Sequence, residues 1–325
     1  MCFCHFYILQ SKKMATFNIP KKTTIKRKYI LAILHHNPDI NINILLEKLN
    51  LKKLDFLLII VDGKFKFKIN KKIKIKKKII FRKKSQYSIP INRNLALKYA
   101  IKKKFEILFF LDSDIKTNKK LISNHLKVHK MFPDAAAVGG SVESSSKFSK
   151  KFNLWELLDG KLSWFQAIKN KDYTYVKKPY HLPTCNISLK LKKIRKYKIK
   201  FNTKLFTGED AYFFEEFRKK KLKFLLTSKC NVVHNDRQSF LDFFLHHMKW
   251  GRHQYYTLYQ SKFPKSFFFF TNTMFILVYP IIFIPMVLLQ SLFVISPWIR
   301  QNAVNVLLLP FFLCLHFSKA VFTYF

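Results

Sequence analysis

The chain has 325 residues, 49% of them hydrophobic and 17% aromatic, which is enough to bury a full core in one large domain with a smaller unit beside it. Five cysteines without paired spacing argue against a zinc cluster and a disulfide framework, and they favour a reducing compartment. The 61 Lys and Arg outnumber the 18 Asp and Glu, and the formal net charge of +43 favours anionic partners: nucleic acid, anionic lipid surfaces or phosphorylated small molecules.

The N-terminal segment "MCFCHFYILQSKK" has an apolar stretch that is too short for a signal peptide, and it contains no small-residue cleavage site. We expect residues 1–24 to form a flexible leader, with Met14 as an alternative start. The main domain is then expected over residues 25–262, and a hydrophobic unit over residues 263–325.

The first part of the main domain alternates short apolar runs with segments of helical spacing. Each expected strand is almost wholly apolar, which is typical of a mostly parallel sheet covered by helices on both faces. We therefore expect an α/β fold. The predicted elements are strands at 29–34, 55–63, 105–112 and 135–143, and helices at 43–51, 92–104 and 118–132.

A lysine-dense segment, "KFKFKINKKIKIKKKIIFRKK", covers residues 64–84. Lysine alternates there with Phe or Ile at period two, which predicts an edge strand or hairpin with one solvated face. A phosphate-binding surface is the alternative interpretation. A general drift of composition toward Lys, Ile, Asn and Phe explains the lysine excess as well as a function does.

Acidic residues stand at the ends of two predicted strands. Ligands of open parallel sheets bind beyond the carboxyl ends of the strands, and Asp62 and the pair Asp112 and Asp114 lie at that edge. Two carboxylates one residue apart suit a hard divalent cation that keeps open positions for substrate phosphates. A capped turn before the helix at Asn118 is the structural alternative.

Two further segments carry candidate groups. Glu209 and Asp210 open a predicted helix after Gly208, where free backbone N–H groups hold a carboxylate and where it could accept a proton from an attacking hydroxyl. An ordinary acidic N-terminal cap is the alternative. The strand "LLTSKCNVVHN" ends in His234, which is either a metal ligand or a core or turn histidine.

The last third of the chain changes character. Residues 266–295 carry no charge and are long enough to cross a bilayer, which needs about 20 apolar residues. Residues 303–317 are shorter and would span with tilt or lie at the interface, and the prolines at 280, 285 and 297 suggest kinks or a re-entrant hairpin. A buried helix hairpin of a soluble protein is the alternative. The basic residues before this unit favour the cytoplasmic face of a membrane for the main domain.

In their order along the chain, these segments resemble the family 2 glycosyltransferases, over about Ile25 to Tyr256. "IIVDG" resembles the family's second-strand Val-Asp segment, "NRNLALKYA" its Ala-Arg-Asn helix start, and "FFLDSD" its Asp-x-Asp motif. "CNISLK" resembles the Gly-x-Asn segment near the acceptor, "GEDAYF" the Glu-Asp helix motif, and "HHMKWGRHQYY" the basic-aromatic segment after the catalytic domain.

The resemblance implies a GT-A-type, mostly parallel sheet flanked by helices and followed by hydrophobic transmembrane or re-entrant helices. It implies an inverting transfer of sugar from a nucleotide-diphospho-sugar donor to a glycan or lipid-linked acceptor, with divalent Mn²⁺ or Mg²⁺ and with a membrane as partner. The segment "KWGR" lacks the Gln-x-x-Arg-Trp form of processive synthases, so we expect single sugar additions.

The implied site has three parts. Asp210 would be the general base with Glu209 beside it, and the metal would be held by Asp114, with Asp112 and His234 as further ligands. Lys249, Trp250 and Arg252 could close over the diphosphate or the acceptor. The remaining predicted contacts are with the nucleotide sugar or acceptor. These residues are Asp62, Arg93, Asp112, Asn186, Trp250 and Arg252.

Two other functions stay open. The charge alone suits a basic nucleic-acid-binding protein, but the sequence shows no aromatic-basic RNA signature, helix-turn-helix or zinc spacing, so we expect no nucleic acid partner. A membrane protein that keeps the fold as an inactive scaffold is the third interpretation, because the first two strands depart from the family pattern: "HHNPD" follows the first and Asp-Gly-Lys ends the second.

Overall fold

A computed structural model of the chain describes residues 28–62, 68–83, 88–149, 151–167, 172–177, 180–205, 207–260 and 273–324. The side chains of residues 62, 252–260, 273–280 and 322–324 are not among those described. The predicted leader, 1–24, also lies outside the described residues.

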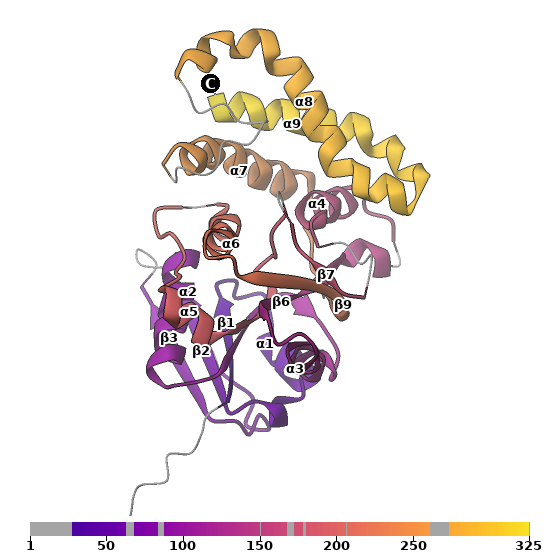
Figure 1. Cartoon of the computed structure of the whole chain (residues 1–325). Coiled ribbons are helices and arrows are strands. Elements are labelled where there is room, and N and C mark those ends of the chain that lie inside the picture. Colours follow the sequence, from indigo (N-terminus) through magenta and orange to yellow (C-terminus); the bar gives the residue numbers. More distant parts are fainter. Residues whose placement is uncertain are drawn as a thin grey trace, which may run out of the picture.

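The described strands form one mixed sheet in the order β3-β2-β1-β4-β8-β6-β9-β5, with β7 paired to β9 (Figure 1). Strands β1 to β4 run parallel, and β8 joins β4 and β6 in antiparallel pairs. Strand β9 runs parallel to β6 and antiparallel to β5. The strands are β1 (Tyr29–His35), β2 (Phe56–Asp62), β3 (Lys77–Arg82), β4 (Ile107–Asp112), β5 (Ile115–Lys116), β6 (Ala135–Ser144), β7 (Thr174–Tyr175), β8 (Asn186–Lys190) and β9 (Lys223–His234).

Helices cover both faces of the sheet, and this explains the apolar strand sequences. Along β1, Leu31 and Ile33 belong to the core beneath α1 and α3, while Ile30 and Ala32 belong to the core beneath α2, α5 and α6. Successive strand side chains point to opposite faces, so a strand buried on both sides needs apolar residues at every position. These helices are α1 (Ile42–Lys48), α2 (Ile89–Lys102), α3 (Leu121–Met131), α5 (Leu191–Tyr197) and α6 (Glu209–Lys219).

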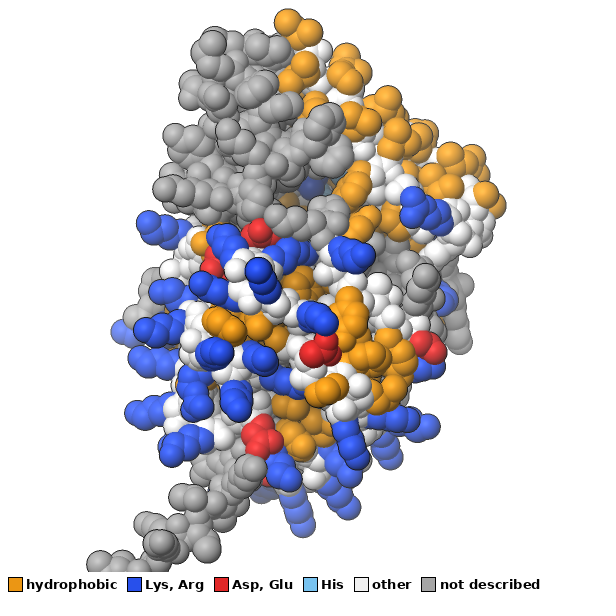
Figure 2. Space-filling view, in the orientation of Figure 1, with side chains coloured by type: hydrophobic (Ala, Val, Ile, Leu, Met, Phe, Trp, Pro, Cys, Tyr) orange, Lys and Arg blue, Asp and Glu red, His pale blue; other side chains and the backbone are white. Residues whose placement is uncertain are grey.

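The predicted strands and helices of the first half are confirmed, with ends that differ by a few residues. In the lysine-dense segment, β3 pairs with the outer side of β2 and has partly exposed side chains, so this part is the predicted edge strand. Residues 63–67 and 84–87 of the same region lie outside the described residues. Figure 2 shows Lys and Arg spread over the visible face of this domain.

A second layer of helices packs above the sheet domain: α4 (Leu154–Trp164), α7 (Phe240–Gln260), α8 (Thr273–Gln301) and α9 (Leu309–Tyr324), with the short 3-10 helix η4 (Ala303–Leu308) between the last two (Figure 1). These helices share an apolar core of their own, which includes Leu158, Phe243, Ile295 and Phe312. Two segments are long and apolar enough to cross a membrane, Ile281–Gln301 and Ala303–Val321.

The chain is therefore an α/β protein with a mostly parallel mixed sheet flanked by helices and with two apolar C-terminal helices. The carboxyl ends of β1, β2 and β4 meet at one edge of the sheet, because parallel strands end on the same side. Figure 1 shows α6 at this end, beneath α7.

Candidate active site

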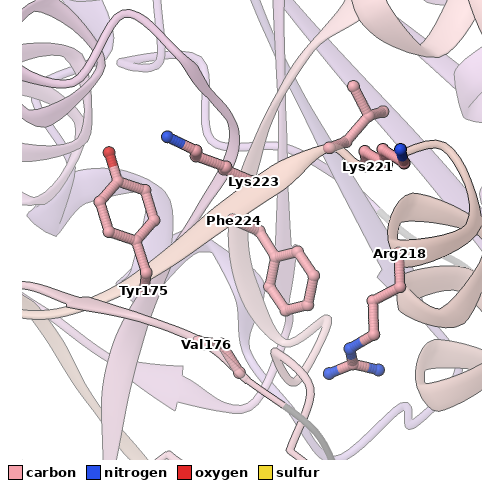
Figure 3. Close-up of a pocket in the computed structure, with 7 residues that line it drawn as sticks. Tyr175, Val176, Arg218, Lys221, Lys223 and Phe224 are labelled. Atoms are coloured by element: carbon pink, nitrogen blue, oxygen red, sulfur yellow. The ribbon is translucent and has the colours of Figure 1, made fainter.

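A hollow at the beginning of β9 is the first candidate for a site (Figure 3). It is lined by Tyr175, Val176, Arg218, Lys221, Leu222, Lys223 and Phe224. Two of its cations already have acidic partners, since Lys223 lies 2.9 Å from Asp134 and Arg218 lies 3.2 Å from Glu215. The predicted site residues lie elsewhere: His234 ends the same strand, on the order of 35 Å further along it.

The second candidate is the turn that follows β4. The backbone N–H of Asp112 donates to the carbonyl of Cys185, which fixes the end of the strand beside β8. The chain turns through the buried Ser113 and enters β5, which pairs Ile115 with His234 of β9. This register brings Asp114 and His234 together although they are far apart in the sequence.

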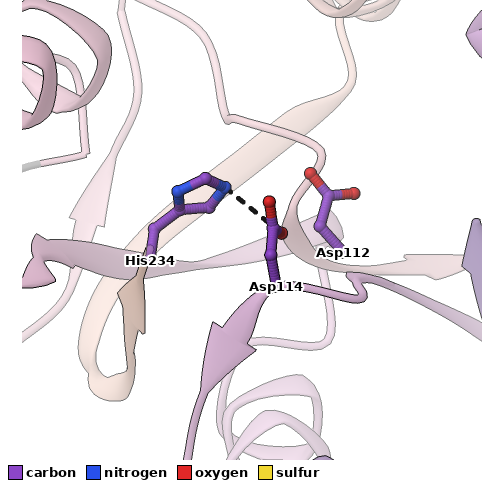
Figure 4. A group of neighbouring side chains, drawn as sticks. All are labelled: Asp112, Asp114 and His234. Carbon is purple, nitrogen blue, oxygen red and sulfur yellow. Dashed lines mark ion pairs between the residues drawn. The ribbon is translucent and has the colours of Figure 1, made fainter. Parts of the chain in front are cut away.

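Ligand atoms of Asp112, Asp114 and His234 all lie within 4.8 Å of one another (Figure 4). His234 Nε2 lies 3.4 Å from Asp114 Oδ1. Ligand atoms around a single Mg²⁺ at about 2.1 Å lie up to about 4.2 Å apart, so these three groups need only small movements to bind one ion. The two carboxylates of the Asp-x-Asp motif and the histidine at the end of β9 thus form a possible metal site.

The surroundings of His234 also fit a metal ligand. Its Nδ1 lies 3.4 Å from Asp236 Oδ1, and that carboxylate accepts a hydrogen bond from Trp164 Nε1 at 2.9 Å. A ligating histidine generally gives its other N–H to a carboxylate or carbonyl, which fixes the ring and its tautomer. The carboxylate of Asp236, which is 6% exposed, is the group that would accept this N–H from His234.

Arg93 joins the end of β4 to the start of α6. Its Nη1 lies 2.6 Å from Glu209 Oε1, and its Nη2 lies 3.9 Å from Asp112 Oδ1. The Arg93 and Glu209 side chains are only 7% and 12% exposed. The guanidinium predicted to contact the nucleotide is thus engaged by two carboxylates of the chain itself.

Asp210, the second residue of α6, lies beside the N-terminal end of this helix. Its Oδ1 accepts the backbone N–H of Ala211 at 2.8 Å and lies 3.5 Å from His181 Nε2. Gly208 precedes the helix as its N-cap, and its φ of 70° is a conformation that favours glycine. The Asp210 side chain is 22% exposed and therefore accessible, whereas the Glu209 side chain is only 12% exposed.

The electrostatics show that the acids share one environment. Burial raises the pKa of the Cys185 thiol, and the charges of Asp112, Asp114 and Asp210 raise it further. These three carboxylates, from two distant segments, are therefore all near enough to one buried thiol to affect its pKa. With Glu209 and Asp236, five of the 18 acidic residues of the chain gather at this edge.

The individual pKa values respond to this crowding. Burial raises the pKa of Asp112 against the opposing charge of Arg93. Burial also acts to raise the pKa of Asp210, but His181 and Arg93 outweigh it and the pKa falls. Burial acts to lower the pKa of His234, yet Asp114 and Asp236 raise it to about 10. The site thus draws positive charge, as a proton or as a cation.

The predicted residue Asn186 is fully buried in a polar network. Its Oδ1 lies 3.1 Å from His125 Nε2 and its Nδ2 donates to the carbonyl of Cys230 at 2.7 Å. His125 Nδ1 lies 2.9 Å from Ser188 Oγ. A side chain at Gly140 would collide with the Cys230 carbonyl and with Asn186, so this approach requires glycine. Contact between Asn186 and a substrate stays a prediction.

Trp250, Asp62 and Arg252 are the other predicted residues. Trp250 packs against His246 and His247 of α7, and the ammonium of Lys319 on α9 lies 5.9 Å from its ring. The side chains of Asp62 and Arg252 lie outside the described residues. Their predicted contacts with the nucleotide sugar stay predictions.

The sequence reasoning missed His181 and Asp236. His181 stands five residues before Asn186 in "YHLPTCN", and no spacing in the sequence ties it to Asp210. Asp236 follows His234 by two residues in "VHND", and that short acid-histidine spacing was the available signal. The chain matches no protein-family model and none of the curated proteins, so its function must be inferred from these side chains.

Proposed function

We propose that the chain is an inverting, metal-dependent glycosyltransferase, which moves a sugar from a nucleotide-diphospho-sugar to a hydroxyl of a glycan or lipid-linked acceptor. The observation that carries the proposal is the meeting of accessible carboxylates from two distant segments. Asp112, Asp114 and Asp210 are 34%, 28% and 22% exposed, while the groups that hold them are enclosed. This is the edge of the sheet where ligands of parallel sheets bind.

In the proposed reaction the acceptor oxygen bonds to the anomeric carbon of the donor sugar. The bond from that carbon to the diphosphate oxygen breaks, and its electron pair leaves with the nucleoside diphosphate. Asp210 accepts the proton of the attacking hydroxyl. His181 and Arg93 hold the pKa of Asp210 low, so the group is ionised and ready to accept this proton.

Asp112, Asp114 and His234 would hold the divalent cation, Mn²⁺ or Mg²⁺, and Asp236 would orient His234. When bound, the cation would offset the charge that develops on the leaving diphosphate. We assign Arg93 and Glu209 positioning roles, because their ion pair is nearly enclosed and ties α6 to the end of β4.

The proposal extends to location. The main domain would lie on the cytoplasmic face of a membrane, because cationic residues near anionic lipid gain about 1 kcal/mol each. The same charge would favour acceptors that carry phosphate groups. The net charge of +43 supports both statements.

The proposal is tested by following nucleoside diphosphate release from a panel of sugar nucleotides, with Mn²⁺, with Mg²⁺ and with chelator. We expect release with at least one donor, its loss on chelation, and its loss in Asp114→Asn. Asp134→Asn is the matched control, since Asp134 is an exposed carboxylate just before β6, at the opposite edge of the sheet. Salt-sensitive RNA binding without any sugar-nucleotide binding would overturn the proposal.

A further inference from the structure

The two apolar helices α8 and α9 raise the question of how they meet a membrane. By length and composition each could cross one. A crossing helix carries its far end away from the domain that precedes it, and a helix that lies in the membrane plane keeps both ends beside that domain. The contacts of α8 distinguish these arrangements.

The C-terminal end of α8 is attached to α4. The indole Nε1 of Trp298 donates to the backbone carbonyl of Lys161 at 2.9 Å, and the Lys161 ammonium lies 4.3 Å from the centre of the indole. Five residues earlier, Phe293 stacks on Tyr180 at 5.8 Å with an angle of 10° between the rings. This end of α8 therefore lies against the domain that carries the candidate active site.

The N-terminal half of α8 is also backed by the protein. Phe283 and Val287 form a small core with Ala320 of α9. Helix α9 in turn lies against α7, where a side chain at Gly251 would come within 2.6 Å of the Lys319 carbonyl. In this half, α8 lies on α9 and α9 lies on α7, which of the three is nearest the sheet domain in Figure 1.

The outward face of α8 is apolar. The exposed side chains of this face are Ile281, Ile284, Leu288, Leu289 and Leu292. Their spacing of three and four residues makes one stripe along the helix. Figure 2 shows hydrophobic side chains gathered along this outer edge of the molecule.

An exposed cation stands at the C-terminal end of α8, where Arg300 follows Leu292 of the stripe by eight residues. Two buried polar side chains form a hydrogen bond between α8 and α9, since Ser291 Oγ lies 2.9 Å from His316 Nδ1. A helix with one exposed apolar face, a backed inner face and a cation at its end suits the interface of an anionic bilayer.

We propose that α8 and α9 form an in-plane membrane seat: the outward stripe of α8 enters the near leaflet of an anionic bilayer, and neither helix crosses it. This inference stands apart from the proposed sugar transfer. Because Tyr180 touches α8 and adjoins His181, the seat also brings the His181–Asp210 pair close to the membrane surface.

The test uses the full chain in sealed proteoliposomes, with Cys2, Cys4 and Cys314 replaced by serine. A new cysteine at the hairpin turn, Ala303→Cys, is compared with Lys192→Cys on α5, since both positions are exposed. We expect an impermeant maleimide to label both sites to the same extent in vesicles where the sheet domain faces outward. Labelling of Ala303→Cys only after permeabilisation would show a crossing and overturn the proposal.

A depth measurement provides the second readout. A polarity-sensitive fluorophore on Leu288→Cys should be quenched by lipids labelled near the headgroup more than by lipids labelled at the chain ends. Flotation should increase when phosphatidylglycerol is added to phosphatidylcholine vesicles. A chain that does not float, and whose stripe is instead cross-linked to a second copy in solution, would also overturn the proposal.

Discussion

The guanidinium of Arg93 on α2 lies 2.6 Å from the carboxylate of Glu209 on α6, although 116 residues separate them in the sequence. The pair is nearly enclosed and also reaches Asp112 at 3.9 Å. It therefore links the helix that carries Asp210 to the turn that carries the Asp-x-Asp motif. The geometry of the candidate site depends on this link.

Removing one member of the pair should destabilise the protein strongly. Arg93→Met leaves the Glu209 carboxylate buried without its cation, and such losses cost about 3–5 kcal/mol in the free energy of unfolding. Urea denaturation in detergent measures this cost. In a Glu209→Gln background Arg93→Met should cost much less, and equal costs in the two backgrounds would contradict the link.

Metal binding should depend on Asp236 as well as on the ligands. Asp236→Asn weakens the hold on His234, and the loss of such a partner lowers metal affinity by about 10- to 100-fold. Calorimetric titration with Mn²⁺ measures the affinity without any need for turnover. Asp134→Asn should bind as the parent does, and an unchanged affinity in Asp236→Asn would rule out the assigned role.

The strands β1, β2, β4, β6 and β9, the Asp-x-Asp turn and the start of α6 were predictable from the sequence. Each depends on local chemistry: an apolar run long enough for a buried strand, or a glycine before an acidic helix start. Asp112, Asp114 and His234 meet through the register of β5 with β9, which no local pattern encodes. From the sequence, only the resemblance indicated that these three residues would lie close together. The pairing of β5 with β9 explains why they do.

Other features could not be predicted for a related reason. The enclosure of Glu209 follows from a contact with α2, so the sequence alone could not separate its role from that of its neighbour Asp210. The orientation of α8 depends on the contacts of Trp298 with α4 and of Phe293 with Tyr180, while length and hydropathy are the same for a crossing and an in-plane helix.

The neighbours Glu209 and Asp210 should respond differently to the same substitution. Asp210→Asn removes the accessible base, so kcat should fall by about 10²- to 10⁴-fold with little change in stability. Glu209→Gln removes an enclosed partner of Arg93, so the loss should appear chiefly as a lower urea midpoint. Full activity in Asp210→Asn would refute the assignment of the base.

Stability should fall in mild acid because of two buried histidines on α3. Burial lowers the pKa of His125 to about 4 and that of His129 to about 3, so both are neutral in the folded protein. The unfolded chain, with ordinary values of about 6.5, binds more protons below that pH. The contribution of these two side chains to the free energy of unfolding should therefore be constant above about pH 6.5 and should decrease by several kcal/mol as the pH falls toward 4.

Urea denaturation at a series of pH values measures this slope. His129→Gln keeps a polar group near Ser188, which lies 2.8 Å from His129 Nε2, and removes one titrating site. The slope between about pH 6.5 and pH 4 should then be smaller in His129→Gln than in the parent. A parent slope that persists in His129→Gln would contradict the prediction.

The contact between Phe293 and Tyr180 should connect the membrane seat to the active site. Phe293 lies on the inner side of α8 and also meets Phe165 at 5.8 Å, while its neighbour Leu292 is 39% exposed on the outer stripe. Phe293→Ala should lower kcat/KM about 2- to 10-fold, because an aromatic pair contributes about 0.5–1.5 kcal/mol. Mn²⁺ affinity should stay the same, since Phe293 contacts none of the proposed ligands.

Leu292→Ala should weaken vesicle flotation and leave turnover in detergent unchanged. If the two variants had the same effects on both measurements, the seat would act only as an anchor and the connection to His181 and Asp210 would be refuted.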